Sequence, residues 1–175
     1  MKYCPNCASE LQNRLIDNRQ RKVCIAADCG YVYWDNPLPV VAAIVQYNND
    51  VILARNSQWP KGMFSLITGF LEKQETPEQA ILREVKEELG LEAEVVDYIG
   101  HYSFIARNQL LLAFCVNATG DLRVGEEIAE TKFLSKPQLK QYSFGRLSLT
   151  AEIVKDWFAK SSPTSESGTN DEIPA

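Results

Sequence analysis

Residues 69–91 read GFLEKQETPEQAILREVKEELGL and place carboxylates at spacings that could hold a metal ion. Glu84 lies four residues before Glu88 and three before Glu87, so a helix would bring these side chains onto one face. Like charges at such spacings cost on the order of 0.3 kcal/mol per pair, so this face is poorly arranged for stability alone. A divalent cation removes the repulsion, because Mg²⁺ prefers carboxylate, water and phosphate oxygens. The cluster therefore indicates a site for a divalent metal ion.

The segment from 76 to 90 carries the start and stop signals of a helix. Thr76 can cap the helix, Pro77 suits its first position, and Gln79 completes a capping box. Gly90 stands where a left-handed cap would end it. Apolar residues at three- and four-residue spacing predict one buried stripe, which consists of Ala80, Ile81, Val85 and Leu89.

The approach to this helix distinguishes it from an ordinary acidic helix on a protein surface. A strand is expected over 63–68, and residues 69–74 must then turn sharply into the helix. Glu75 directly precedes the Thr76 cap. A solvated acidic face, which is the alternative interpretation, does not need this loop. The pattern therefore favours a binding site.

These residues resemble the Nudix signature, G-x5-E-x7-R-E-U-x-E-E-x-G-U, in which U is a bulky aliphatic residue. Its specified positions are filled by Gly69, Glu75, Arg83, Glu84, Val85, Glu87, Glu88, Gly90 and Leu91. If each fixed residue type occurs at about 7%, a chance match has a probability of roughly one in a billion at each starting position. The resemblance implies a pyrophosphohydrolase that depends on Mg²⁺ or Mn²⁺.

The resemblance also implies the metal ligands. Glu84 and Glu88 would be the main ligands, and Glu87 would be a further ligand or act through water. The backbone carbonyl of Thr68, just before the signature, would also reach a metal. Such a metal polarises the phosphoryl group, holds the leaving phosphate and lowers the pKa of bound water.

Two further acidic positions are expected to matter. Arg83 would orient Glu75 or its neighbours through an ion pair rather than contact the substrate. Family members often recruit one more acid from a downstream loop. Glu127, within GEEIAE, is the expected residue, with Glu126 and Glu130 as alternatives.

Four cysteines near the N-terminus form a second candidate metal site. Cys4 and Cys7 form one pair, and Cys24 and Cys29 the other, with sixteen residues between the pairs. Thiolate pairs in tight turns suit tetrahedral Zn²⁺, and two disulfides are the alternative. No secretory signal is visible, and a reducing compartment favours metal over disulfides. We expect structural Zn²⁺, because a ribbon of roughly thirty-five residues buries too little apolar surface to fold alone.

Composition and charge exclude several other classes of protein. The 175 residues suit one main domain with a small appendage, and their net charge is −5. Three of these negative charges lie in residues 161–175, which leaves −2 for the rest and no general attraction to nucleic acid. No stretch approaches the roughly eighteen apolar residues of a membrane span. We expect a cytoplasmic protein without membrane association, ending in a disordered tail over 161–175.

Strands alternate with helices through the main part of the chain. The expected elements besides those above are a hairpin over 40–47 and 51–55, strands over 92–106, 109–118 and 131–135, and a helix over 147–160. A mixed sheet flanked by helices results, which agrees with the α/β/α sandwich that the resemblance implies. We expect a zinc ribbon over 1–36 and a Nudix hydrolase domain over 37–160.

A zinc ribbon joined to this signature is similar to NADH pyrophosphatases and to zinc-ribbon enzymes acting on FAD or ADP-ribose. The implied reaction breaks the pyrophosphate of a nucleoside diphosphate derivative and releases AMP with a second phosphorylated product. NADH pyrophosphatases carry an S-Q-P-W-P-F-P type motif after the signature, whereas this chain has GHYSFIARNQLLLAF there. The departure favours substrates of the ADP-ribose or FAD type.

Few residues speak to substrate recognition beyond the pyrophosphate. Tyr33 and Trp34 are the best candidates to stack on a base, because family members keep an aromatic contact just past the last zinc cysteine. Such residues can instead pack the ribbon against the main domain. Gly69 begins the loop that presents the carboxylates in the family, and it joins the expected substrate-binding residues.

Two other functions stay open from the sequence. The first is removal of an RNA cap such as NAD, with the basic residues of the ribbon loop binding RNA: Arg14, Arg19, Arg21 and Lys22. The second is a non-catalytic module that senses nucleotides, which would not need the intact acid cluster. The resemblance further implies a homodimer, because many relatives build their substrate pocket across two chains.

Overall fold

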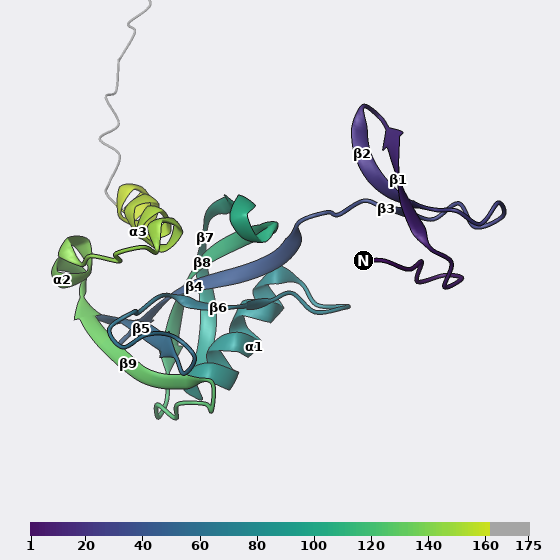
Figure 1. Cartoon of the computed structure of the whole chain (residues 1–175). Helices are drawn as coiled ribbons and strands as arrows, with labels where there is room; N and C mark the ends of the chain where they lie inside the picture. The colour runs from purple at the N-terminus through teal and green to yellow at the C-terminus, as the bar shows by residue number, and fades with distance from the viewer. Residues whose placement is uncertain (162–175) are drawn as a thin grey trace, which may run out of the picture. The chain divides into compact units, whose positions relative to one another are not determined.

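The computed structural model describes residues 1–161, which divide into two compact units (Figure 1). The first unit comprises residues 1–37, and the second begins at Leu38. The helix that ends the described part extends to Ser161, the first residue of the expected tail. The rest of that tail lies outside the described residues.

The N-terminal unit is a small antiparallel sheet with a core of only a few residues. Its strands lie in the order β1, β2, β3 and span Leu11–Ile16, Arg19–Cys24 and Val32–Tyr33. The buried residues are Cys4, Leu11 and Cys24. The basic residues expected in a loop lie instead on the β1–β2 hairpin, where Arg14 pairs with Arg21 across the strands.

A mixed sheet forms the centre of the second unit. Strand β4 (Leu38–Tyr47) lies in its middle, and its buried apolar run from Val40 to Val45 is typical of a strand covered on both faces. It pairs in parallel with β8 and antiparallel with β5 and β6. The spatial order of the strands is β7-β8-β4-β5-β9, with β6 beside β4. The bounds of the other strands are β5 Asp50–Asn56, β6 Ile67–Phe70, β7 Glu92–Phe104, β8 Gln109–Thr119 and β9 Ile128–Ser135.

Helices cover the two faces of this sheet and form two separate apolar cores (Figure 1). Helix α1 (Pro77–Leu89) packs on one face through the predicted stripe of Ala80, Ile81, Val85 and Leu89. Helices α2 (Lys136–Gln141) and α3 (Ser148–Ser161) contribute to the core of the other face. The α/β/α sandwich that the sequence predicts is confirmed.

Local predictions differ from the structure at three strands and one helix. The strand expected over 131–135 begins earlier, at Ile128. The strand expected over 63–68 begins at Ile67 and continues through Gly69 to Phe70, because these residues pair with β4. The strand expected over 92–106 ends at Phe104, and a short 3-10 turn (η1, Ile105–Arg107) follows. Helix α2 is not predicted from the sequence. Among residues 1–161, no helix is long and apolar enough to cross a membrane.

Candidate functional site

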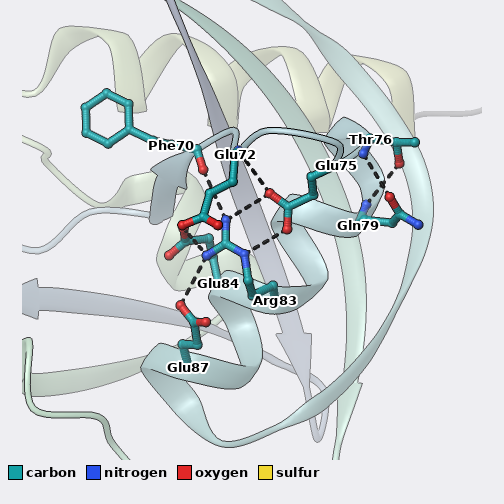
Figure 2. A network of polar contacts seen from close by, with 8 residues as sticks. All are labelled: Phe70, Glu72, Glu75, Thr76, Gln79, Arg83, Glu84 and Glu87. Carbon is teal, nitrogen blue, oxygen red and sulfur yellow. Dashed lines mark hydrogen bonds and ion pairs between the residues drawn. The ribbon is translucent and has the colours of Figure 1, made fainter.

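A capping box fixes the start of helix α1 and so decides which residues its acidic face presents. Thr76 Oγ1 accepts a hydrogen bond from the Gln79 backbone N–H at 3.3 Å, and the Gln79 side chain accepts one from the Thr76 N–H at 2.9 Å (Figure 2). Pro77 begins the helix, and Gly90 ends it in the left-handed region with a φ of 68°. The sequence predicts each of these features.

Arg83 is the centre of the polar network on this face (Figure 2). Its Nε and Nη2 donate to the two carboxylate oxygens of Glu75 at 2.7 and 3.0 Å. Its Nη1 donates to Glu84 at 2.7 Å and to Glu87 at 3.1 Å. Nη2 also donates to the Phe70 backbone carbonyl at 3.1 Å, which ties the helix to the end of β6. The guanidinium thus joins loop, strand and helix, with the ion pair expected between Arg83 and Glu75.

Gly69 leaves the space that the Glu84 side chain occupies. A Cβ at position 69 would overlap the Glu84 carboxyl group. Gly69 pairs with Val41 in the sheet, and the preceding Thr68 pairs with Ala42, so their backbone is fixed by β4. The signature glycine is required here by a close approach of a carboxylate rather than by a turn.

Burial and mutual repulsion shape the electrostatics of the acidic face. Burial, together with the charges of Glu84, Glu127 and Glu87, raises the pKa of Glu88 to about 8. Burial also raises the pKa of Glu84, although Arg83 opposes the shift. A divalent cation bound among these carboxylates would stabilise their charged forms, because it offsets both their burial and their mutual repulsion.

The acidic oxygens fit a hard divalent cation by their chemistry, but they are not drawn together as closely as the cysteines. Among residues 1–161, the four cysteines are the only group of three or more His, Cys, Asp or Glu side chains that lie close enough together to hold a metal ion, with their ligand atoms within 4.8 Å of one another. Glu84 and Glu87 each give an oxygen to Arg83. Within the same described residues, Glu88 forms no ion pair with an arginine or lysine. Of these three α1 carboxylates, Glu88 is therefore the one whose negative charge is not compensated by an ion pair with a described residue.

The three downstream acids have different surroundings. Glu130 lies on β9 and accepts a hydrogen bond from Arg55 at 3.0 Å, which lowers the pKa of Glu130. Glu127 lies close enough to the helix for its charge to raise the pKa of both Glu84 and Glu88. All three acids are exposed. Of the three, Glu127 is the one whose charge acts on the α1 carboxylates Glu84 and Glu88.

The four cysteines of the N-terminal unit converge as the sequence predicts. The Sγ atoms of Cys4 and Cys29 are 3.6 Å apart, and those of Cys7 and Cys24 are 3.4 Å apart. Sulfurs about 2.3 Å from a tetrahedral Zn²⁺ have comparable separations, whereas a disulfide needs about 2.05 Å. All four cysteines are free thiols. The geometry fits a zinc ribbon.

The aromatic candidates for stacking belong to the N-terminal unit. The Tyr33 hydroxyl donates to Asp35 at 2.9 Å. The Trp34 side chain is 46% exposed, and the Arg21 guanidinium lies 4.7 Å from the centre of its ring. Trp34 therefore keeps exposed surface for a further contact, and stacking by either residue stays a prediction.

Sequence interpretation overlooked two residues, one on β5 and one in the loop that lies against α1. Arg55 is buried on β5 and pairs with Glu130. Gly125 lies so close to helix α1 that a Cβ there would overlap the Glu87 carbonyl oxygen. A glycine directly before the acidic stretch 126–127 is the signal that could have found Gly125. Nothing in the local sequence of Arg55 marks it out from an ordinary strand residue.

Two family models match the chain. The model described as "NUDIX domain" matches residues 37–155, and the model described as "Nudix N-terminal", a zinc ribbon, matches residues 2–34. Together they cover both units that the structure describes.

Named relatives and a solved structure agree with these matches. A Vibrio atlanticus (strain LGP32) protein named NAD-capped RNA hydrolase NudC is 32% identical over 69% of this chain and 43% of its own length. An ADP-ribose pyrophosphatase of Methanocaldococcus jannaschii is 31% identical over 73% of this chain and 76% of its own. A NUDIX hydrolase from Nitrosomonas europaea has the same fold, with a TM-score of 0.78 at 24% identity over 92% of both chains.

The match to the NudC proteins is partial in length. The chain spans about half the length of these curated relatives, between 43% and 58% for the first three.

Proposed function

The chain belongs to the Nudix family, and from that premise we propose that it hydrolyses the pyrophosphate bond of a nucleoside diphosphate derivative. The observation that carries the proposal is the close fit between Gly69 and the Glu84 carboxylate, beside the other acids of α1. This arrangement directs oxygen ligands to the junction of β6 and α1, where the signature loop begins.

The proposed metal ligands are Glu84 and Glu88, with Glu87, Glu127 and the Thr68 carbonyl as further ligands. Mg²⁺ or Mn²⁺ held there would polarise the phosphoryl group and make bound water more acidic. For Glu87 to join, its carboxylate must turn away from Arg83, to which it is bonded at 3.1 Å. Glu88 needs no such change, because no arginine or lysine of the described residues pairs with it.

Arg83 and Glu75 would position the catalytic carboxylates. The two hydrogen bonds between them fix the guanidinium plane, and the remaining Nη1 donates to Glu84. A bidentate pair of this kind adds geometric specificity as well as energy. In this proposal Arg83 orients Glu84 before the substrate binds and does not contact the substrate itself.

The proposed substrate contains adenosine diphosphate joined to another group, as in ADP-ribose, FAD or NADH. The names of the relatives support this class, since they include an ADP-ribose pyrophosphatase and NAD-capped RNA hydrolases. Gly69 would lie against the pyrophosphate, and Tyr33 or Trp34 would stack on a base, which is worth about 1–3 kcal/mol per base in other proteins. The products would be AMP and a second phosphorylated compound.

The experiment that tests this proposal is chromatographic analysis of products from NADH, NAD, ADP-ribose and FAD in parallel, with Mg²⁺ or Mn²⁺. AMP with the matching monophosphate from any of these supports the proposal and identifies the substrate. Binding of a nucleotide without any product would instead support the sensing alternative.

Cap removal from RNA is the second candidate function, and the face of the β1–β2 hairpin favours it. Arg14 and Arg21 are direct cross-strand partners, so their side chains share one face, and Arg19 lies two residues before Arg21 on that face. Like charges opposite each other on a sheet are destabilising. Arginines on this face, with Arg21 beside the partly exposed Trp34, suit phosphates and a stacked base.

A double variant, Arg14→Gln with Arg19→Gln, tests this second candidate. If the hairpin face binds RNA, the variant should hydrolyse NAD-capped RNA more slowly than the wild type, while its rate on free NAD stays the same. The difference should shrink at high salt, because phosphate contacts are salt-dependent. Equal loss on both substrates, or no loss, would contradict RNA binding by this face.

Three further proposals accompany the function. We assign residues 1–36 to the zinc ribbon and 37–160 to the hydrolase domain. The homodimer and the cytoplasmic location that the sequence predicts stay predictions, which sedimentation and localisation experiments can test.

A further inference from the structure

The loop over 120–127, which joins β8 to β9, is bonded to the last turn of helix α1. The Arg123 N–H donates to the Leu89 carbonyl at 2.8 Å, and the Gly125 N–H donates to the Glu88 carbonyl at 2.9 Å. The last carbonyl groups of a helix have no partner inside it, so such a loop satisfies them. The loop is therefore fixed to the same turn that carries the Glu88 carboxylate.

Gly125 is the point at which the loop comes closest to the helix. A Cβ at this position would overlap the Glu87 carbonyl oxygen. The φ of Gly125 is not in the left-handed region, so space rather than backbone conformation requires the glycine. Any larger residue must move the loop away from α1.

The other side of the loop is bonded to the segment that follows β5. The Ser57 N–H donates to the Glu127 carbonyl at 2.7 Å, and the Ile128 N–H donates to the Gly125 carbonyl at 3.1 Å. The buried Arg55 donates to both Glu130 and the Trp59 carbonyl at 3.0 Å. The backbone of Glu127 is thus held between the helix and β5.

We propose that Gly125 is a positioning residue, which lets the 120–127 loop seat against α1 and so brings Glu127 to the same divalent cation as Glu84 and Glu88. The inference rests on the proposed metal-dependent function. From the other side, the Ser57 N–H after β5 holds the loop by its bond to the Glu127 carbonyl. The Gly125 N–H bond to the Glu88 carbonyl places the loop, two residues before Glu127, against the turn that carries Glu88.

The test is the affinity of the full chain for Mn²⁺, measured by the electron paramagnetic resonance of free Mn²⁺ with zinc retained in the ribbon. Gly125→Ala and Glu127→Gln should each weaken binding by about tenfold, the lower limit for residues that orient metal ligands. The double variant should bind no more weakly than the weaker single variant, because both changes remove the same ligand. Two matched controls, Glu126→Gln and Gly100→Ala, should bind as the wild type does, since a Cβ at Gly100 meets only ordinary contacts.

Two results would overturn the inference. One is a folded Gly125→Ala variant with the Mn²⁺ affinity of the wild type, and the other is a double variant whose losses multiply. If Gly125→Ala does not fold, Glu127→Asp keeps the charge and shortens its reach, and unchanged affinity in that variant would also overturn the inference.

The same titration separates this inference from the proposed function. Loss of Mn²⁺ binding in Glu88→Gln, with none in Gly125→Ala or Glu127→Gln, would overturn only the role of the loop. A wild-type chain that binds no Mn²⁺ while zinc occupies the ribbon would overturn the metal-dependent function as well.

Discussion

The Arg83 guanidinium binds the Glu75 carboxylate through two hydrogen bonds, from Nε at 2.7 Å and from Nη2 at 3.0 Å. Both side chains are largely buried, with exposed fractions of 24% and 14%. Glu75 also accepts a bond from the Glu72 backbone N–H at 3.1 Å. The pair therefore joins the signature loop to helix α1 at the point where the loop must hold its shape.

Replacing Arg83 by lysine should destabilise the protein, because an ammonium group cannot bind Glu75 through two donors in one plane. We expect a loss of about 2 kcal/mol in the free energy of unfolding, measured by urea denaturation. Lys86→Gln is the matched control, since it removes only the exposed pair with Glu92 and should change stability by less than about 1 kcal/mol. Equal losses in the two variants would contradict the role of the Arg83–Glu75 pair.

Stability without Mg²⁺ or Mn²⁺ should fall as the pH rises from about 5 to 8. The pKa of Glu88 in the folded protein is raised to about 8, mainly by burial, whereas in the unfolded chain it is about 4.3. Between these values the folded state binds more protons than the unfolded state, so deprotonation at higher pH favours unfolding. The lowered pKa of Glu75 acts in the opposite direction only near and below pH 4.

Urea denaturation at pH 5.5 and 7.5 checks this dependence. We expect the wild type to lose stability on the order of 3 kcal/mol between the two pH values, and Glu88→Gln to lose much less. Adding Mg²⁺ should restore the wild type at pH 7.5. A wild type that is more stable at pH 7.5 than at 5.5 without metal would show that Glu88 is not the controlling group.

Removing zinc should unfold the N-terminal unit, because its buried core consists of little more than Cys4, Leu11 and Cys24. A dye that reports zinc should detect one ion per chain when the thiols are blocked. Cys29→Ser should bind less zinc and lose the dispersed amide signals of residues 1–37 in a heteronuclear spectrum. Cys115→Ser is the control, since Cys115 is buried in the sheet of the other unit. Full zinc content in Cys29→Ser would contradict the four-cysteine site.

Gly69→Ala should weaken metal binding, because the added methyl group would displace the Glu84 carboxylate. We expect Mn²⁺ affinity to fall by about tenfold or more, measured by calorimetric titration. Gly100→Ala places the same methyl group in a strand where the nearest atom, the Tyr102 hydroxyl oxygen, lies 3.4 Å away. Similar Mn²⁺ affinities for the two variants would contradict the explanation that glycine at position 69 makes room for the Glu84 carboxylate.

The sequence predicts the parts of the fold that local chemistry decides. The capping box at Thr76 and the left-handed Gly90 depend on neighbouring residues, and both are present as expected. The same reasoning could have found α2, since Ser135 and Gln138 repeat the capping box with Pro137 near the helix start. The element was overlooked because it has only six residues and little periodicity.

The residues that hold the site from a distance could not be predicted from spacing. Ile67 to Phe70 form a strand because β4 supplies their partners, and pairing of this kind is a tertiary effect. Arg55 on β5 meets Glu130 on β9, a residue 75 positions later in the sequence. Gly125 matters only because the 120–127 loop folds back onto α1. Signature residues on one helix can be inferred from the sequence. Residues that reach the site from other strands and loops can be identified only once the fold is known.

The most direct test of the central claim is the rate of AMP release by the wild type and by Glu88→Gln at saturating Mg²⁺, on whichever dinucleotide substrate is turned over. The account predicts that Glu88→Gln stays folded but releases AMP at least about a hundredfold more slowly, because it lacks a ligand of the catalytic metal. A Glu88→Gln variant that releases AMP at the wild-type rate would contradict the account.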